Sequence, residues 1–470
     1  MKKRMFSILL VFAMILMMAV PAFAEGDVAQ IGETKYPTLA AAVAAAKEGD
    51  TVTLLQDASG CGIITGNGDV KNFTIDFGGH TYTVNQEPLA GSSGTETQCF
   101  QLLKETGSLT MKNGTIVADH SDAWMIIQNY CDLTLVAMTL DATRGTNSVD
   151  YVLSNNHGDV TITGNTIITP KAGDGNVAFD VCDFADYGKC SVTFDENFTG
   201  SINGKMEYTG TDPENYKLVI KNGNFVEFQV PDNFKSAAAD GGITVSGGKF
   251  EYEFPAEYLA DGYVLVQDAN GKFVPVDKAV EYKITYVLGD HAENVDSNPA
   301  TYTVEDEVSL EDAVADYDYI FKGWYYDEKF ANPVNDPAIS KGNTGDITFY
   351  AKVDAVVYKV TYENVEGAEN KNPASYSAEA SFKLQDPVKK GYKFEGWYFD
   401  KDLKDEIKGD DLTVSTENYY GNLVFYAKWS KVETKTPETG DNSGIAAVTI
   451  LLISAVGAAA ALTLRRRVDR

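Results

Sequence analysis

Leu109-Thr-Met-Lys-Asn-Gly-Thr-Ile116 and, further along the chain, Leu133-Thr-Leu-Val-Ala-Met-Thr-Leu140 share one pattern. Each stretch alternates apolar and polar residues, bends, and then starts a second apolar strand. Alternation is the period of a β-strand, so the pattern predicts a strand, a turn and another strand. The other copies, two of them looser, begin 24 to 36 residues apart and cover residues 73–82, 160–167, 192–198, 218–225 and 243–250.

A strand repeat of this length predicts an all-β solenoid in which each coil stacks on the next. Leu109 and Met111 would then lie against Leu133 and Leu135 of the following coil. The pattern resembles the right-handed parallel β-helix of pectate-lyase-like surface proteins over about residues 28–275. Within it, the strand–helix–strand pattern of residues 31–57 resembles that family's N-terminal cap. A two-sheet β-sandwich is the alternative fold.

An acidic insertion, Gly173–Cys190, is the candidate binding loop of this domain. Glycoside hydrolases need two carboxylates about 5–9.5 Å apart, and the spacing here does not show that any two converge. A solvated acidic loop is the simplest interpretation, with a weak calcium or glycan site as the functional one. The four candidate residues are Asp174, Asp180, Asp183 and Asp186.

The sequence offers little catalytic chemistry elsewhere. A polysaccharide lyase needs a basic residue at the substrate carbon, and Arg144 is the only arginine in residues 25–464. The four histidines have no metal-ligand spacing. We therefore expect no catalytic residues, no resident metal and no cofactor, apart from weak Ca²⁺ binding.

The second half of the chain contains a duplication. Tyr319-Ile-Phe-Lys-Gly-Trp-Tyr-Tyr-Asp327 matches Tyr392-Lys-Phe-Glu-Gly-Trp-Tyr-Phe-Asp400, and a Phe-Tyr-Ala-Lys block closes each copy. Neither copy contains cysteine, so a core of apolar residues must hold each one, with Trp324 and Trp397 as central packing residues. The blocks resemble the internalin-B-type, or Listeria–Bacteroides, repeat. That resemblance implies two small β-grasp-like modules that act as a stalk or in interactions.

The net charge limits the classes of partner that the chain can bind. The formal net charge is −29, and because the two basic ends contribute +5, residues 25–440 carry −34. Such a body repels nucleic acid and anionic membrane, so no nucleic-acid partner is expected.

The cysteine count is five, an odd number, which leaves at least one free thiol. Cys182 and Cys190 could form a bridge, or all five could be small buried apolar residues.

The N-terminus has the features of a secretory signal peptide. Lys2, Lys3 and Arg4 precede an apolar run, which ends in a small-x-small site formed by Ala22 and Ala24. Cleavage after Ala24 is therefore predicted, and an uncleaved membrane anchor is the alternative.

The C-terminus has three parts in a fixed order. Residues 445–464 are uncharged and long enough, at about 1.5 Å rise per residue, to span a bilayer as a helix. Residues 465–470 are basic and would stay cytoplasmic. The tail resembles a sortase cell-wall sorting signal. The resemblance implies cleavage after Thr439 and attachment to peptidoglycan; a plain single-pass membrane protein is the alternative. The sorting residues are Thr436, Pro437, Glu438, Thr439 and Gly440.

These features predict an extracellular protein of a Gram-positive-type cell, anchored to the wall by its C-terminus, with sortase, peptidoglycan and the membrane as partners. The expected function is that of an adhesin or binding protein for glycans or host proteins. A wall-attached polysaccharide lyase or glycoside hydrolase and a structural envelope protein are the alternatives. The expected segments are 1–24 (signal peptide), 25–277 (β-helix), 278–354 and 355–430 (repeats), 431–444 (linker), 445–464 (transmembrane helix) and 465–470 (tail).

Overall fold

The computed structural model describes residues 26–433 except 67–70, 92–94, 145–146, 174–175 and 185–186. The signal peptide, the sorting residues, the transmembrane span and the basic tail lie outside these residues. The described chain is mostly strand with few helices, so the all-β prediction is confirmed. It forms two compact units, one with the residues up to Ala315 and Phe321–Val353, the other with Asp316–Ile320 and the residues from Asp354 on.

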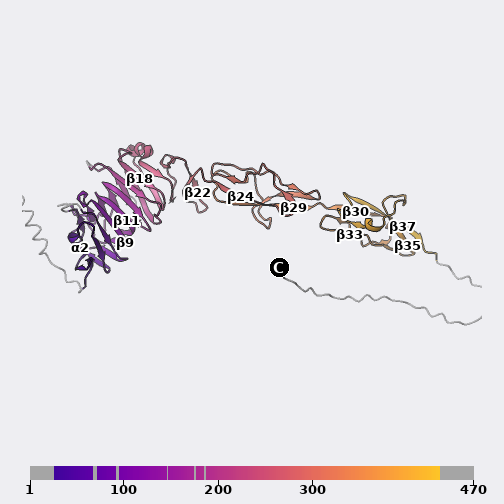
Figure 1. Cartoon of the computed structure of the whole chain (residues 1–470), viewed down its shortest axis with the longest axis horizontal. Coiled ribbons are helices and arrows are strands. Elements are labelled where there is room, and N and C mark those ends of the chain that lie inside the picture. Colours follow the sequence, from indigo (N-terminus) through magenta and orange to yellow (C-terminus); the bar gives the residue numbers. More distant parts are fainter. Residues whose placement is uncertain are drawn as a thin grey trace, which may run out of the picture. The chain divides into compact units, whose positions relative to one another are not determined.

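The N-terminal part of the first unit consists of parallel strands in three stacks, here called stacks A, B and C (Figure 1). Stack B contains β3 (Thr51–Leu54), β6 (Phe73–Asp76), the first halves of β9 (Ser108–Ala118) and β11 (Asp132–Asp141), β13 (Gly158–Thr163), β16 (Cys190–Phe194), β18 (Tyr216–Ile220) and β20 (Ile243–Val245). Stack A contains β4 (Ala58–Gly60), β7 (Thr81–Val84), the second halves of β9 and β11, β14 (Ile167–Thr169), the first residues of β17 (Ser201–Thr209) and β19 (Asn224–Gln229), and β21 (Lys249–Phe250). Stack C contains β5 (Ile63–Thr65), β8 (Gln98–Leu102), β10 (Met125–Asn129), β12 (Tyr151–Asn155), β15 (Val177–Cys182) and the later residues of β17 and β19.

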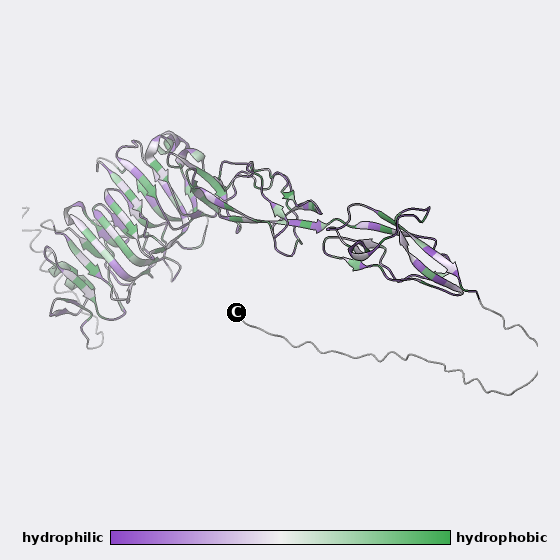
Figure 2. Ribbon diagram, turned by 45° about the vertical axis from the view of Figure 1, so that its right-hand side comes forward, coloured by the Kyte–Doolittle hydropathy of each residue, from purple (hydrophilic) through white to green (hydrophobic). Residues whose placement is uncertain are grey.

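The strand register follows the repeat in the sequence. Leu109 pairs with Leu133 and Met111 with Leu135, and all four are at most 1% exposed. Figure 2 shows the resulting alternation of apolar and polar residues along these strands. Because one side of each strand faces the interior, alternation buries its apolar set and leaves the polar set outside.

The bend between stacks B and A needs a left-handed backbone. Equivalent positions of three successive coils, Asn113, Ala137 and Gly164, have φ of 60°, 52° and 61°. Glycine and asparagine adopt this conformation most easily, which explains their recurrence in the repeated turn. Ala137 adopts it at a steric cost of about 1–2 kcal/mol.

Different elements close the two ends of the stacks. At the first coil, β1 (Ala29–Ile31) pairs antiparallel with β2 (Thr34–Tyr36) and β3, and Thr38 caps helix α2 (Leu39–Ala45) by accepting a 3.1 Å bond from the Ala41 amide. At the last coil, the antiparallel hairpin of β22 (Tyr263–Gln267) and β23 (Phe273–Asp277) pairs with β21. The remaining short helical segments are Lys104–Thr106, Asp232–Phe234, α3 (Lys235–Ala237), Ala238–Gly242 and Ala256–Tyr258.

Aromatic residues fill the interior of the later coils. The ring centroids of Phe225 lie 5.1 Å from Phe194 and 5.0 Å from Phe250, and Phe250 lies 4.6 Å from Phe254. All five cysteines are free, so the Cys182–Cys190 bridge that the sequence left open is not formed. The stacks are therefore held by packing and strand pairing instead of covalent links.

Each repeat contains a four-stranded mixed sheet whose central strands are parallel. The strand order is β26-β24-β29-β28 in the first repeat and β32-β30-β37-β35 in the second, with β24 parallel to β29 and β30 parallel to β37. The first repeat contains β24 (Tyr282–Val287), β25 (Ala292–Glu293), β26 (Thr301–Tyr302), β27 (Val314–Ala315), β28 (Tyr319–Tyr325) and β29 (Ile347–Ala355). The second contains β30 (Tyr358–Glu363), β31 (Ala368–Glu369), β32 (Ser375–Tyr376), β33 (Phe382–Lys383), β34 (Val388–Lys389), β35 (Tyr392–Tyr398), a short 3₁₀ helix (Gly409–Leu412), β36 (Thr413–Val414) and β37 (Leu423–Lys431).

The Gly-Trp-Tyr and Tyr-Ala-Lys blocks recur together because they meet in the sheet. In the second repeat Trp397 pairs with Ala427, and the Lys428 ammonium lies 5.0 Å from the centre of the Tyr398 ring. In the first repeat Lys352 takes the same position, 6.0 Å from the Tyr325 ring. A cation over a tyrosine face is attracted by the ring quadrupole, and its aliphatic stem covers apolar surface.

An aspartate at the end of the Gly-Trp-Tyr block organises the following loop. The Asp400 carboxylate accepts the Asp405 and Lys404 amides at 2.7 and 3.0 Å, and these bonds lower its pKa, the Asp405 bond most. A lowered pKa stabilises the fold above the pKa of an unfolded aspartate, and this contribution is lost as the pH falls through the folded value. Asp400→Asn should therefore lower the melting temperature of the second repeat at pH 7 and change it little at pH 2. Thermal unfolding at both values, with Asp386→Asn as an exposed control, tests this; equal losses at both pH values would contradict it.

Candidate functional site

A row of polar residues runs along the outward side of stack C. Strand pairing aligns these residues across successive coils, and each directly follows a residue buried in the interior. Because side chains alternate along a strand, the row lies on the side opposite to these interior residues, and Gln101, Ser154 and Asp180 are buried on that side too. This row, here called the polar ladder, consists of Gln101, Gln128, Ser154, Asp180 and Glu207.

Hydrogen bonds connect neighbours along the polar ladder. The Gln101 carboxamide donates to Gln128 Oε1 at 2.9 Å, and the Ser154 hydroxyl donates to Asp180 Oδ2 at 3.2 Å. Glu207 accepts a 3.0 Å bond from the Tyr151 hydroxyl. Such bonds fix the side-chain rotamers, and Gln128 and Glu207 are the partly exposed members of the row.

Asp180, like Gln101 and Ser154, is a buried member of the polar ladder. Its side chain belongs to a residue that is only 4% exposed, and its Oδ1 accepts the Asn155 amide at 2.6 Å. The pKa of this carboxyl is raised to about 7, mainly by burial and also by the neighbouring Glu207 charge, while the hydrogen bonds from Asn155 and Ser154 oppose the shift. Burial raises the pKa of Tyr130 and of Tyr151, and the Asp180 charge adds a smaller contribution to each.

Three aromatic rings gather beyond the carboxyl ends of stack C strands. Tyr130 follows β10, while Phe184 and Tyr187 follow β15. The centroids of Tyr130 and Tyr187 are 4.7 Å apart, and Phe184 and Tyr187 stack at 6.0 Å with 26° between their planes. Phe184 is 45% exposed and Tyr187 is 37% exposed, whereas Tyr130 is buried beneath them, so two of the three rings reach solvent.

Of the four aspartates predicted from the sequence, the structure describes Asp180 and Asp183. Asp180 lies within strand β15, and its charge lies beside Glu207, a residue that the sequence reading missed. Asp183 follows the strand and accepts a hydrogen bond from the Thr211 hydroxyl. Asp174 and Asp186 lie outside the described residues. The spacing of 27 residues between Asp180 and Glu207 equals one coil, and this periodicity is the signal that could have found the pair.

The predicted packing residues Trp324 and Trp397 lie in the cores of their repeats. Trp324 is 6% exposed and Trp397 is 1% exposed. Each indole N–H donates to a main-chain carbonyl, that of Glu311 at 2.8 Å and that of Gln385 at 3.1 Å. An indole that is buried and hydrogen-bonded in this way has no free face to offer a sugar.

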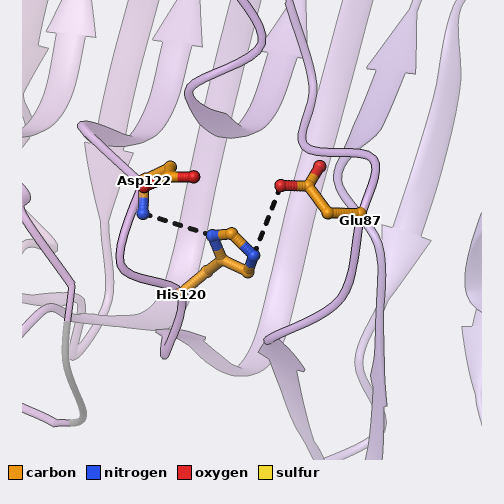
Figure 3. A group of neighbouring side chains, drawn as sticks. All are labelled: Glu87, His120 and Asp122. Atoms are coloured by element: carbon orange, nitrogen blue, oxygen red, sulfur yellow. Dashed lines mark hydrogen bonds and ion pairs between the residues drawn. The ribbon is translucent and has the colours of Figure 1, made fainter.

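A second titratable cluster consists of Glu87, His120 and Asp122 (Figure 3). One potential ligand atom from each residue lies within 4.8 Å of the others. However, His120 Nδ1 accepts the Asp122 amide at 3.2 Å, which places the imidazole proton on Nε2, 3.4 Å from the Glu87 carboxylate. A metal-bound histidine normally donates its second N–H, so this pattern fits a hydrogen bond to Glu87 better than metal ligation.

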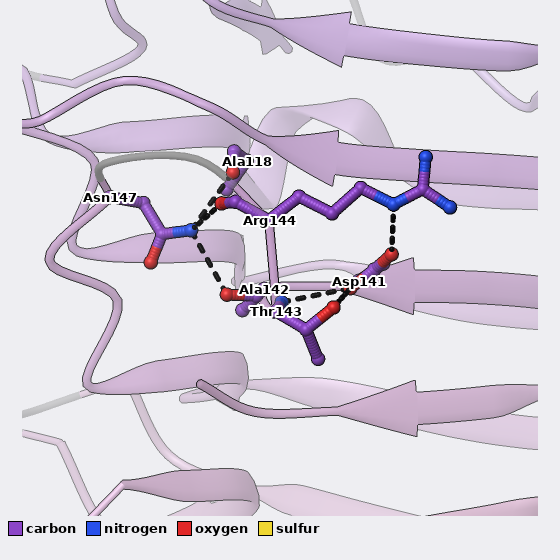
Figure 4. Close-up of polar contacts among 6 residues, drawn as sticks. All are labelled: Ala118, Asp141, Ala142, Thr143, Arg144 and Asn147. Atoms are coloured by element: carbon purple, nitrogen blue, oxygen red, sulfur yellow. Dashed lines mark hydrogen bonds and ion pairs between the residues drawn. The ribbon is translucent and has the colours of Figure 1, made fainter. Parts of the chain in front are cut away.

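Arg144, the one arginine in residues 25–464, has a structural partner at the end of the preceding strand β11 (Figure 4). Its Nε lies 3.1 Å from an Asp141 carboxylate oxygen. In the same loop the buried Asn147 carboxamide donates to the carbonyls of Ala118, Ala142 and Arg144. The loop is therefore fixed by its own polar contacts, and Arg144 is held by a carboxylate on the strand before it.

A shallow pocket of about 310 Å³ lies over the last coils of stack A. Lys249 and Lys272 line it, and each forms an ion pair, with Asp268 at 3.7 Å and with Glu251. Since paired charges leave little net attraction for an ionic ligand, the pocket is a weaker candidate site than the face of stack C.

Comparison with known proteins identifies the repeats. The Listeria–Bacteroides repeat domain matches residues 282–352 and 358–428, so the chain contains two copies of it, as the sequence predicted. Two proteins of Evansella cellulosilytica are similar to parts of this chain. A "Putative Gly-rich membrane protein" is 33% identical over 126 residues, which are 26% of this chain and 13% of that protein. A "Putative membrane protein" is 33% identical over 112 residues, which are 23% of this chain and 15% of that protein.

This chain thus spans less than a sixth of the length of these two relatives, so the similarity concerns a segment of each. No solved structure matches the chain. In the part of the chain that the structure describes, no helix is both long and apolar enough to cross a bilayer.

Proposed function

We propose that the chain is a non-catalytic carbohydrate-binding protein displayed on the outside of a cell. The observation that carries the proposal is the aromatic cluster in which Phe184 and Tyr187 are exposed and pack on the buried Tyr130, beyond the end of the strand that carries Asp180. Aromatic rings offer a flat apolar surface to the face of a sugar ring, and fixed carboxamides, hydroxyls and carboxylates bond its hydroxyl groups. The two features together suit an extended polysaccharide better than a compact ligand.

The three parallel stacks support the right-handed pectate-lyase-like β-helix as the fold of residues 25–277. A parallel sheet in each repeat, formed by its two central strands, supports the β-grasp-like fold for 278–354 and 355–430. In this proposal the repeats form a stalk that carries the β-helix. The domain boundaries remain predictions.

Attachment to the cell surface is supported by the repeats, which suit a surface or membrane-associated protein, and by the relatives, whose names describe membrane proteins. In our proposal the signal peptide exports the chain and a sortase joins Thr439 to peptidoglycan. Mass spectrometry of wall fragments released by a muramidase should find a peptide that ends at Thr439. If only intact C-termini were found, in the membrane fraction, the sortase step would be contradicted and the chain would be a plain single-pass membrane protein.

The binding function is tested by screening the purified full chain, in mild detergent, on a glycan array and against uronate-containing polymers. Specific retention without release of products is the expected result. Product release that Asp180→Asn and Asp183→Asn abolish would instead establish a polysaccharide lyase or hydrolase. If the chain showed neither retention nor turnover, the proposal would be contradicted, and a structural envelope protein would be the remaining function.

A further inference from the structure

Two carboxylates at the later coils of stack C have no cationic partner among the described residues: Asp183 directly precedes Phe184, and Glu207 pairs in register with Asp180. Among the described residues neither Glu207 nor Asp183 forms an ion pair, and each accepts a hydroxyl hydrogen bond, from Tyr151 and from Thr211. Lys205 lies two residues before Glu207 but makes no ion pair with it in the described structure. These two carboxylates add negative charge to a body that already carries −34 over residues 25–440.

The aromatic cluster is a platform and not a cage. An aromatic cage for a methylated ammonium group needs rings that are separated enough to admit the group between them. Here Tyr187 is in direct contact with Tyr130 on one side and Phe184 on the other, with centroids 4.7 and 6.0 Å away. The packed rings therefore leave no such gap, and the exposed apolar surface of Phe184 and Tyr187 is available to one side of a pyranose ring.

We propose that the ligand of this face is a polysaccharide that carries protonated amino groups. This inference rests on the proposed carbohydrate-binding function and names its substrate class. The sugar rings pack on Phe184 and Tyr187, while ammonium groups lie near the carboxylates of Glu207 and Asp183. Opposite charges favour this ligand, whereas a uronate polymer would add like charge to an acidic face.

Chitin and its deacetylated form, chitosan, have the same backbone and differ only in whether the amino group is acetylated. Comparing them therefore tests whether the face recognises a protonated amino group. Soluble oligomers of equal length are titrated into the full chain in mild detergent at pH 6. We expect about tenfold tighter binding of the deacetylated oligomer, and this preference should shrink as salt is raised. Glu207→Gln should remove most of the preference. Asp261→Asn, an exposed carboxylate near the last coil, should leave it unchanged.

The outcomes separate the inference from the function on which it rests. Equal binding of both oligomers would overturn the amino-group inference while the carbohydrate-binding function stands. Binding of neither oligomer, together with an empty glycan array, would overturn both. Phe184→Ala and Tyr187→Ala should weaken both oligomers alike, whereas Tyr252→Ala, an aromatic residue that is 59% exposed elsewhere in the domain, should weaken neither. Thermal unfolding of each variant shows whether it is folded.

Discussion

Replacing Trp397 by alanine is expected to unfold the second repeat and to leave the parallel stacks intact. Trp397 is 1% exposed, and its ring lies 5.3 Å from Tyr362 and 5.4 Å from Phe394. Truncating a buried tryptophan costs about 3–5 kcal/mol, which is comparable with the whole stability of a small domain. The lost indole N–H also leaves the Gln385 carbonyl without its 3.1 Å partner.

Hydrogen exchange of the full chain measures this effect region by region. Amides of residues 355–430 should lose protection in Trp397→Ala, while those of the parallel stacks keep it. Trp397→Phe, which retains much of the ring packing, should lose far less. Unchanged protection of residues 355–430 in the alanine variant would mean that the tryptophan does not hold the core of the repeat.

The second large effect is expected from Asp180→Asn, which should stabilise the parallel stacks at pH 8. An unfolded aspartate has a pKa near 3.9, whereas burial raises the pKa of folded Asp180 to about 7. Between these values the folded state holds one more proton than the unfolded state, so stability falls as the pH rises from about 4 to 7 and then stays constant. A shift of about three pH units corresponds to on the order of 4 kcal/mol.

The asparagine keeps the shape of the side chain and an oxygen for the Asn155 amide, but it has no proton to lose. Urea denaturation at pH 5 and pH 8, followed by circular dichroism, should show a smaller loss of stability in the variant than in the parent. Asp261→Asn serves as the exposed control. If the parent and the Asp180→Asn variant lost equal stability between the two pH values, Asp180 would not be the buried acid described above.

The sequence predicted the parts of the fold that depend on local pattern. Alternation placed Leu109 and Leu133 in register, and the duplicated Gly-Trp-Tyr block located Trp324 and Trp397. Both signals, the alternation of apolar residues and the repeated aromatic block, are local because each can be recognised within a few neighbouring residues. The all-β class and the two repeats followed from them.

The site depended on stacking, which local pattern does not reveal. Tyr130 and Tyr187 are 57 residues apart, and they meet only because two intervening coils have a particular length. Asp180 was read as part of an acidic loop because it lies among other aspartates, whereas strand β15 carries it onto the outward face beside Glu207. Knowing the coil length for each turn of the chain would have been necessary to predict either contact.

The central claim is that the outward face of stack C binds a polysaccharide, and a hydrogen-exchange footprint tests it most directly. The full chain is compared with and without a saturating amount of the oligosaccharide that binds best. The account predicts slowed exchange in residues 125–130, 151–156 and 176–184, and unchanged exchange in both repeats. Slowed exchange confined to the repeats, or to the pocket over the last coils of stack A, would contradict it.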